Sequence, residues 1–405
     1  LFMRNSRPKI WVVVKKCVAA VLLIALLAIF ATSFSPVYDY DEPTPFSGKD
    51  IFNPYAAVQG IDSIDWKRAN FHTHTRVEGL LNECEYWPQD VDKAYRKLDY
   101  DIVTFSNHNE LTTHPYNVEL QVNVYEHGIN LFKYHKLVFG CKETNAFDNI
   151  VPLFDFQKQY QLDMLGEESD FIQMNHPLRT IGTSEQEMST LEGYEIMELD
   201  SGKSTENEYW DWALSSGHYS FGLANDDLHY PDRSNKIAIR CNFLYCESGK
   251  YEDLKKTLLG GAYYSMRVPD YGDGDWAVKT AKNQNLPRIE SIGLDSATVH
   301  IALSHKADSI KFTGQHHATL ALAQDTTAAQ YAMQAGDPYV RITAYFPGGE
   351  VIYSNPFARY DASRSPSPFR APSHVINMPL TVLFNLVVLI FGLWAIFMFY
   401  KLVIK

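Results

Sequence analysis

The sequence predicts an α/β fold that is followed by a small β-rich unit and flanked by two transmembrane helices. Short apolar runs typical of strands alternate with helical or loop stretches through residues 66–282, which favours an α/β barrel or layered sheet. Residues 287–360 alternate apolar and polar side chains with a period of two, which indicates antiparallel strands. Long apolar runs at 10–34 and 378–400 flank these units, and the segment 35–65 is expected to be a linker.

Composition narrows the class of protein further. The 405 residues carry a net charge of −12, and 46% of them are hydrophobic and 14% aromatic. This apolar content excludes a disordered or low-complexity chain. The acidic balance argues against a nucleic-acid partner, because phosphate backbones require a clustered basic surface. Five scattered cysteines are too few for a disulfide scaffold or a Cys-type zinc finger.

The apolar runs at the two ends have the composition of membrane spans. Met378–Tyr400 is apolar except for Thr381 and Asn385, and it exceeds the roughly 20 residues that a span requires. The N-terminal run, Cys17–Ala31 with Ile10–Val14 before it, fits either an uncleaved anchor or a secretory signal. We expect an anchor, because no convincing small-residue cleavage site follows the run.

Flanking charges predict the orientation of these spans. Lys15 and Lys16 precede the first apolar stretch, whereas Asp39 and Asp41 follow it. The positive-inside tendency therefore places the N-terminus in the cytoplasm, and two crossings return the C-terminus to the same side. Residues 35–375 are then expected to lie outside the cytoplasmic membrane, in the periplasm or at the cell exterior.

Strands and helices alternate between the two apolar ends. Periodicity predicts strands at Ala69–His72, Ile102–Ser106, Leu137–Cys141, Phe171–Met174, Gly193–Met197 and Tyr219–Ala224. Helical patterns cover Asp90–Leu98, Tyr209–Ser216 and Tyr251–Leu259. In the β-rich unit, alternation over Thr298–Ser304 and Tyr339–Tyr345 indicates a small β-sandwich.

Histidines and acids gather at the ends of the predicted strands. Because His72 and His74 are separated by one residue on an extended segment, their side chains point to one face and can bind one ion together. In an α/β barrel the C-terminal ends of the strands converge on one mouth. The donors expected there are His72, His74, Glu78, His108, Glu143, His176, Asp227 and His229.

This donor set predicts a pair of divalent metal ions. Mixed imidazole and carboxylate ligands suit Zn²⁺, Mn²⁺ or Fe ions, and eight donors are too many for one tetrahedral ion. A metal pair about 3.5–4 Å apart can hold a bridging hydroxide and stabilise both oxygens of a phosphoryl displacement. A single histidine at a strand end is often an ordinary polar residue. The prediction of a metal site therefore depends on histidines and acids occurring together at the ends of several successive strands.

Five short segments resemble motifs of the PHP (polymerase and histidinol phosphatase) family. They are His72-Thr73-His74, Ser106-Asn107-His108, Gly140-Cys141-Lys142-Glu143, Asn175-His176-Pro177 and Asp226-Asp227-Leu228-His229. The resemblance covers residues 66–270 and implies a distorted (β/α)7 barrel with metal-dependent phosphoesterase activity. It implies the eight donors as metal ligands. The β-rich tail is similar to the small domains that often follow this barrel in secreted bacterial members.

Several positions differ from the family pattern. Glu78 follows His74 at a shorter spacing than the usual acid, and Asn107 replaces an acid that supports the adjacent histidine. Asn149 stands where many members have a further histidine, which favours two ions over three. Asp226 is expected to orient a ligand rather than to bind metal.

Basic residues near these motifs are candidates for binding a phosphoryl group. Arg179 follows His176 and Arg233 follows His229 by a few residues, and Lys203 is a third candidate. Arginine binds phosphate oxygens in a bidentate manner, and lysine binds them as a point charge. We therefore assign Arg179 and Arg233 to the catalytic machinery.

These features together predict a membrane-anchored, extracytoplasmic metal-dependent phosphoesterase. It is expected to contact the membrane and to act on a phosphorylated small molecule or envelope component. No nucleic-acid partner is expected. Two alternatives remain open: a catalytically degenerate ligand-binding or sensor module, favoured by Asn107 and Asn149, and a metal-dependent hydrolase of a non-phosphate bond.

Overall fold

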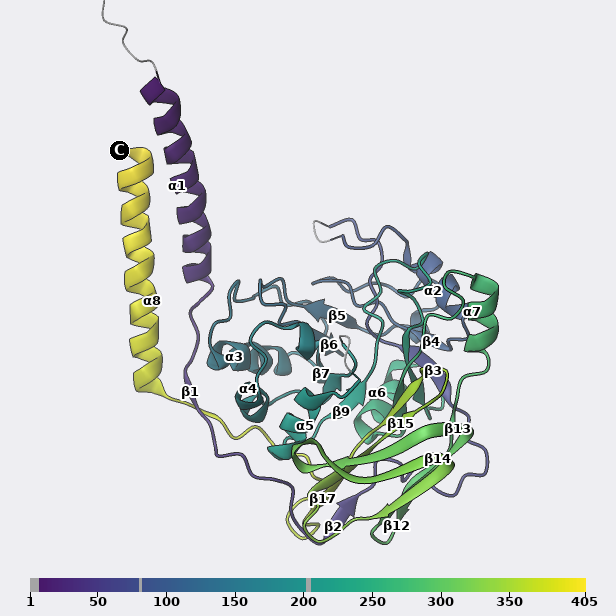
Figure 1. Cartoon of the computed structure of the whole chain (residues 1–405). Coiled ribbons are helices and arrows are strands. Elements are labelled where there is room, and N and C mark those ends of the chain that lie inside the picture. Colours follow the sequence, from purple (N-terminus) through teal and green to yellow (C-terminus); the bar gives the residue numbers. More distant parts are fainter. Residues whose placement is uncertain (1–6, 80–81, 202–204) are drawn as a thin grey trace, which may run out of the picture.

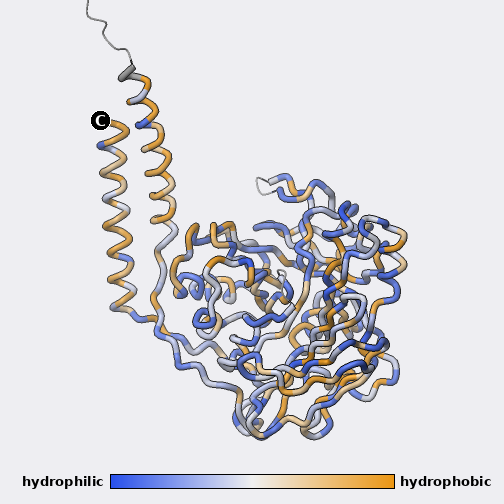
Figure 2. Tube along the Cα trace, viewed as in Figure 1, coloured by the Kyte–Doolittle hydropathy of each residue, from blue (hydrophilic) through white to orange (hydrophobic). Residues whose placement is uncertain are grey.

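The computed structural model describes residues 7–79, 82–201 and 205–405. Two apolar helices, α1 (Arg7–Ala31) and α8 (Met378–Phe399), lie side by side and project from a body that holds the other elements (Figure 1). Hydrophobic residues occupy much of both helices (Figure 2). Ile10–Ala31 and Met378–Ile404 are long and apolar enough to span a bilayer. The predicted apolar helices are therefore present, and they are consistent with membrane anchoring.

Polar residues near the start of α8 connect the helix pair to the body. The Asn385 side chain accepts a hydrogen bond from the Ser35 backbone N–H (3.2 Å) and donates one to the Ser35 carbonyl (3.1 Å). The Thr381 hydroxyl accepts a hydrogen bond from the Val37 N–H (2.9 Å). The two polar interruptions of the C-terminal apolar run thus satisfy backbone groups of the chain that leaves α1.

A five-stranded sheet has the order β5-β6-β7-β8-β9. Strands β7, β8 and β9 are parallel, whereas β6 is antiparallel to both of its neighbours, β5 and β7. The C-terminal ends of the other four strands therefore share one edge with the N-terminal end of β6. The bounds are β5 (Val124–His127), β6 (Lys136–Phe139), β7 (Phe171–Met174), β8 (Ile196–Glu198) and β9 (Phe221–Leu223).

A second sheet of eleven strands follows the main order β12-β13-β15-β16-β11-β10-β3-β4, with β14, β17 and β2 beside this path. Its only parallel pair among the described residues is β3–β4. The bounds are β2 (Asp50–Phe52), β3 (Lys67–Asn70), β4 (Ile102–Val103), β10 (Arg240–Leu244), β11 (Tyr263–Arg267), β12 (Ile289–Asp295), β13 (Thr298–Gly314), β14 (Ala318–Ala332), β15 (Tyr339–Tyr345), β16 (Val351–Ser354) and β17 (Phe357–Tyr360).

The β-rich tail belongs to this second sheet. Because β16 pairs with β11, hydrogen bonding continues from residues 289–360 into the strands β11, β10 and β3. The alternating strand predicted at Tyr339–Tyr345 is confirmed with those bounds, and that at Thr298–Ser304 is the first half of β13. The division into a barrel and a separate β-sandwich stays a prediction.

The two sheets meet through two isolated parallel bridges, Thr73↔Leu228 and His108↔Glu126. Each bridge lies just beyond the C-terminal end of a strand and next to residues of the predicted metal site. The fold is a mixed α/β arrangement of two sheets, and its closure into a (β/α)7 barrel stays a prediction.

Helices cover the sheets and connect their strands. The three helices that the sequence predicts inside the body are confirmed within two residues as α2 (Pro88–Arg96), α5 (Glu208–Ser215) and α6 (Tyr251–Gly260). The helices α3 (Asp155–Gly166), α4 (Glu185–Thr190) and α7 (Trp276–Asn283) were not expected. Helix α3 buries Gln157, Lys158 and Gln161, so its sequence lacks the apolar periodicity that identifies a helix.

The segment expected as a linker, 35–65, packs into the body instead. Phe46, Tyr55 and Val58 are buried, and β2 pairs with β17. The Tyr55 hydroxyl donates a hydrogen bond to the Tyr263 carbonyl (3.0 Å) and accepts one from the Asn355 N–H (2.8 Å). A short strand in the same segment, β1 (Tyr38–Asp39), pairs with β18 (Val375–Ile376).

Candidate metal centre

Histidines and acids from both sheets converge where the two isolated bridges join them. Within the described residues, three overlapping groups of side chains each place their donor atoms within 4.8 Å of one another. We call these side chains together the His–acid cluster. It consists of His72, His74, Glu83, His108, Glu126, His135, Asp227 and His229.

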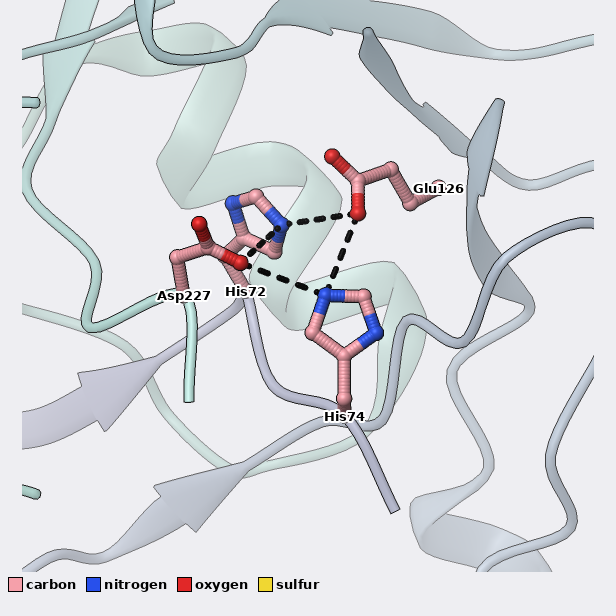
Figure 3. Close-up of side chains that lie close together, drawn as sticks. All are labelled: His72, His74, Glu126 and Asp227. Atoms are coloured by element: carbon pink, nitrogen blue, oxygen red, sulfur yellow. Dashed lines mark hydrogen bonds and ion pairs between the residues drawn. The ribbon is translucent and has the colours of Figure 1, made fainter. Parts of the chain in front are cut away.

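The first group is His72, His74, Glu126 and Asp227 (Figure 3). Glu126 Oε2 lies 3.2 Å from His72 Nε2 and 3.1 Å from His74 Nε2. Asp227 Oδ1 lies 3.3 and 3.2 Å from the same two nitrogens. His72 Nε2 is buried and makes no well-aligned hydrogen bond within the described part of the chain. Two imidazole nitrogens and two carboxylate oxygens converging on one point are a donor set that suits a divalent transition metal.

The other two groups flank the first. Glu83 Oε2 lies 3.4 Å from His229 Nε2 and 3.1 Å from His108 Nε2, and it belongs to the group with His74 and His229. The third group joins His108, Glu126 and His135. Because His74 and Glu126 each belong to two groups, the donors form one continuous cluster.

Glu126 is the centre of this cluster. Its Oε2 also lies 3.2 Å from His108 Nε2, while its Oε1 lies 3.1 Å from His135 Nδ1 and 3.3 Å from His176 Nε2. The Asn175 side chain donates a further hydrogen bond to Oε1 (2.9 Å). The two oxygens of this carboxylate are therefore directed at different imidazoles.

The charges of the cluster compensate one another. Burial alone would lower the pKa of His72, but the carboxylates of Glu126, Asp227 and Glu198 outweigh it and raise this pKa well above its usual value. Conversely, burial would raise the pKa of Glu126, yet the surrounding histidines hold it well below its usual range. Metal binding must displace the imidazole protons, so the affinity for metal is expected to fall as the pH decreases.

Glu198, at the end of β8, orients the donors from behind. Its Oε1 accepts a hydrogen bond from His72 Nδ1 (2.9 Å), and its Oε2 accepts one from the His176 backbone N–H (2.8 Å). A carboxylate on the far nitrogen of an imidazole fixes the tautomer that directs Nε2 at a metal. Glu198 thus holds the His72 ring with its Nε2 atom directed at Glu126 and Asp227.

Asn107 and Asp226 have structural roles beside the cluster. The Asn107 side chain accepts a hydrogen bond from the Thr75 N–H (2.7 Å) and donates one to the Thr112 hydroxyl (2.6 Å). Asp226 accepts hydrogen bonds from the Tyr95 hydroxyl (2.9 Å) and from backbone N–H groups of residues 238–240. Both residues hold loops in place, and the role of Asp226 in orienting a ligand stays a prediction.

The backbone adopts an unusual conformation at one cluster residue, Asp227, and at His176 beside the cluster. His176 and Asp227 have positive φ angles of 28° and 51°. Left-handed backbone costs a non-glycine residue roughly 1–2 kcal/mol, and such conformations concentrate at functional sites. This cost falls on His176 and Asp227, two residues whose side chains contact the cluster.

The two predicted phosphate-binding arginines lie in different environments. The Arg179 guanidinium forms an ion pair with Asp227 Oδ2, so it borders the cluster while its side chain stays exposed. Arg233 is exposed and stacks on the Tyr230 ring, with its Cζ 4.0 Å from the ring centroid. Lys203 lies outside the described residues.

The structure does not bring two of the predicted acids, Glu78 and Glu143, into the cluster. Both are exposed, and Glu143 lines a surface pocket with Lys142 and Asp170. Glu143 follows β6, and β6 runs opposite to its neighbours, so its C-terminal end lies at the other edge of the sheet. Glu78 lies on the loop after His74, and Glu83, further along this loop, approaches the cluster instead.

Four residues that contribute to the site escaped the sequence analysis: Glu83, Glu126, His135 and Glu198. Glu126 lies in β5, a strand that was not predicted, and His135 lies immediately before β6. The available signal was the apolar alternation in Val122–Tyr125 ahead of Glu126. The other predicted donors, His72, His74, His108, His176, Asp227 and His229, all lie in or beside the cluster.

Comparison with known proteins gives structural neighbours but no family assignment. No family model and no curated protein matches the chain. A two-domain protein from Bacteroides vulgatus that contains a predicted PHP-like metal-dependent phosphoesterase has 15% identity and a TM-score of 0.37, over 74% of this chain and 98% of that one. The lesion-specific endonuclease EndoQ from Pyrococcus furiosus has 14% identity and a TM-score of 0.33, over 49% of this chain and 57% of that one.

Proposed function

We propose that this chain is a membrane-anchored, metal-dependent phosphoesterase. The buried cluster of imidazole and carboxylate donors supports a metal-dependent hydrolase. The contact of Arg179 with Asp227 Oδ2 is the observation that carries the choice of a phosphoester. An exposed guanidinium beside the metal ligands can bind the anionic oxygens that a phosphoryl group already carries in the substrate, whereas an amide develops a negative oxygen only in its transition state.

The residues of the cluster have distinct roles in this proposal. His72, His74, Glu126 and Asp227 would hold one divalent ion, and Glu126 would also face a second ion together with His108 and His135. Bound ions would supply an activated water and Lewis-acid stabilisation of the phosphoryl oxygens. Arg179 would bind a phosphoryl oxygen and neutralise the charge that develops there. Glu198 would keep His72 in its ligand tautomer.

The proposed location is the cytoplasmic membrane, with the body outside the cytoplasm and both termini inside. The two apolar helices and the charges that flank them support this arrangement. Protease added to intact spheroplasts should then remove the segment 35–375 while leaving the helices in the membrane. Protection of this segment in intact spheroplasts and cleavage only after lysis would reverse the topology.

The activity is tested with the full chain in detergent. Metal content is measured together with turnover of p-nitrophenyl phosphate and bis-p-nitrophenyl phosphate, and we expect His72→Ala to lose both metal and turnover. Arg179→Ala should lower kcat/KM for the phosphoester by about 100-fold while metal is retained. Arg364→Ala is the matched control, because this exposed arginine pairs with Asp361 rather than with a cluster residue.

Two results would favour the alternatives. A folded wild-type chain that takes up neither Zn²⁺ nor Mn²⁺ would favour the ligand-binding or sensor module. A metal-loaded chain that ignores both phosphoesters, hydrolyses an amide or carboxylate ester and tolerates Arg179→Ala would favour hydrolysis of a non-phosphate bond.

A further inference from the structure

Three loops beside the His–acid cluster expose apolar side chains next to the helix pair. We call residues 128–135, 146–154 and 177–183 the rim loops. Their large apolar side chains include Leu131, Leu153 and Ile181, which are 66%, 62% and 55% exposed. Ile129, Phe154 and Leu178 are also exposed. Apolar side chains gathered at this density are typical of a surface that contacts a partner or a membrane.

Hydrogen bonds join the rim loops into one surface. The Leu131 N–H donates to the Ile150 carbonyl (2.9 Å), and the Ile181 N–H donates to the Phe132 carbonyl (2.8 Å). The exposed charged side chains of these loops are Lys133 and Arg179, both cationic in a chain of net charge −12. Apolar groups mixed with cations match the interface of an anionic bilayer.

The same surface continues into the two apolar helices. The Asn149 side chain donates a hydrogen bond to the Thr32 carbonyl, just past the end of α1, and the Ile150 N–H donates to the Thr32 hydroxyl (3.2 Å). The rings of Phe154 and Phe156 lie with their centroids 5.8 and 4.9 Å from that of Phe384 on α8. Figure 2 shows hydrophobic stretches at the edge of the body beside the helix pair.

The position of Phe384 sets the depth of this surface. Phe384 is the seventh residue of α8, so it lies about 9 Å along the helix from Met378 at about 1.5 Å per residue. If α8 spans the bilayer, a side chain at this position lies at or below the lipid headgroups. The rim loop that packs against it, 146–154, is therefore held at the bilayer interface.

The rim loops carry one member of the His–acid cluster, His135, and begin close to Glu126 and His176 in the sequence. Glu126 lies two residues before the first loop, His135 ends that loop, and His176 immediately precedes the third. Arg179, on the third loop, contacts Asp227. We propose that the rim loops dock on the bilayer and that the phosphate group this centre hydrolyses belongs to a membrane lipid. This inference rests on the proposed function and adds its substrate class.

The docking is tested independently of catalysis. The photocrosslinker benzoylphenylalanine replaces Leu131, Leu153 or Ile181 in the full chain, which is reconstituted into phosphatidylcholine vesicles containing 20% phosphatidic acid, on the order of the anionic lipid content of cell membranes. Leu322 on β14 is the matched control, because it is 52% exposed and β14 lies on the side of the body away from the helices (Figure 1). We expect lipid adducts at the three rim positions and none at Leu322. Adducts with a protein, or no lipid adducts, would overturn the docking.

The substrate class is tested by turnover with the same vesicles and with vesicles in which phosphatidylglycerol replaces the phosphatidic acid. The triple variant Leu131→Ser, Leu153→Ser, Ile181→Ser should lose about tenfold of its turnover of vesicle phosphatidic acid and phosphatidylglycerol, and stay within about twofold of wild type on bis-p-nitrophenyl phosphate in detergent. Equal turnover of vesicle lipid by wild type and variant would overturn the lipid assignment. Hydrolysis of the soluble ester but of neither lipid would overturn it too. Loss of all turnover with lipid adducts intact would refute the phosphoesterase and leave the docking standing.

Discussion

Replacing Glu126 by glutamine is the sharpest test of the metal centre. The change keeps the size of the side chain and one oxygen but removes the negative charge. Glu126 Oε2 lies 3.2, 3.1 and 3.2 Å from the Nε2 atoms of His72, His74 and His108, and the residue is 1% exposed. The glutamine therefore faces the same imidazoles, and the same ions when they are bound, without the charge that balances them.

The size of the effect follows from this burial. Removing one partner from a buried set of opposite charges costs about 3–5 kcal/mol, and about 1.4 kcal/mol corresponds to a factor of ten in binding. Glu126→Gln should thus weaken metal binding by roughly 100- to 3,000-fold. Glu143→Gln, the same chemical change at an exposed acid outside the cluster, should change the affinity by no more than about twofold.

The assay is competition for Zn²⁺ or Mn²⁺ with a fluorescent chelator. The full chain is stripped of metal in detergent and titrated at one fixed pH, because protons compete with metal for the histidines. Circular dichroism of each variant establishes that it is folded. Wild-type affinity in a folded Glu126→Gln chain, or a large loss in Glu143→Gln, would refute the assignment of Glu126 as the central ligand.

Three further outcomes are expected. Glu198→Gln should weaken metal binding by about 10- to 100-fold, because the carboxylate that orients His72 is lost. Competition titration measures this affinity, and an unchanged affinity would exclude the orienting role. Tyr55→Phe should lower the free energy of unfolding by about 1–3 kcal/mol in denaturant titrations, because it leaves the buried Asn355 N–H without its acceptor. No change would mean that the segment 35–65 is not held by this bond. Partial burial lowers the pKa of His374, but hydrogen bonds to Asp163 and Glu192 outweigh this effect and raise the pKa from 6.5 to about 9. The protonated His374 therefore stabilises the fold fully below pH 6.5, and this stabilisation is lost as the pH rises through 9. The fall in the thermal midpoint between pH 6.5 and 9.5 should be smaller in His374→Gln, and an identical fall in both proteins would contradict this linkage.

Local sequence determined the apolar helices and most of the histidines of the cluster. A run such as Met378–Tyr400 is apolar on every face, so its helix follows from composition and length without knowledge of the rest of the chain. The pair His72 and His74 follows from strand geometry alone. Thr381 and Asn385 interrupt the run for a reason that only the fold reveals, because their partners Ser35 and Val37 lie some 350 residues away along the chain.

The acids of the metal centre depended on strand direction, which local periodicity does not encode. Leu137–Cys141 is apolar whichever way it points, so the sequence suggested that Glu143 ends a strand at the common edge. The pairing of β6 with β5 and β7 decides the direction, and it sends Glu143 to the opposite edge while bringing His135 and Glu126 to the cluster. Strand direction is set by hydrogen bonds between segments distant in sequence, so the central carboxylate became visible only in the tertiary structure.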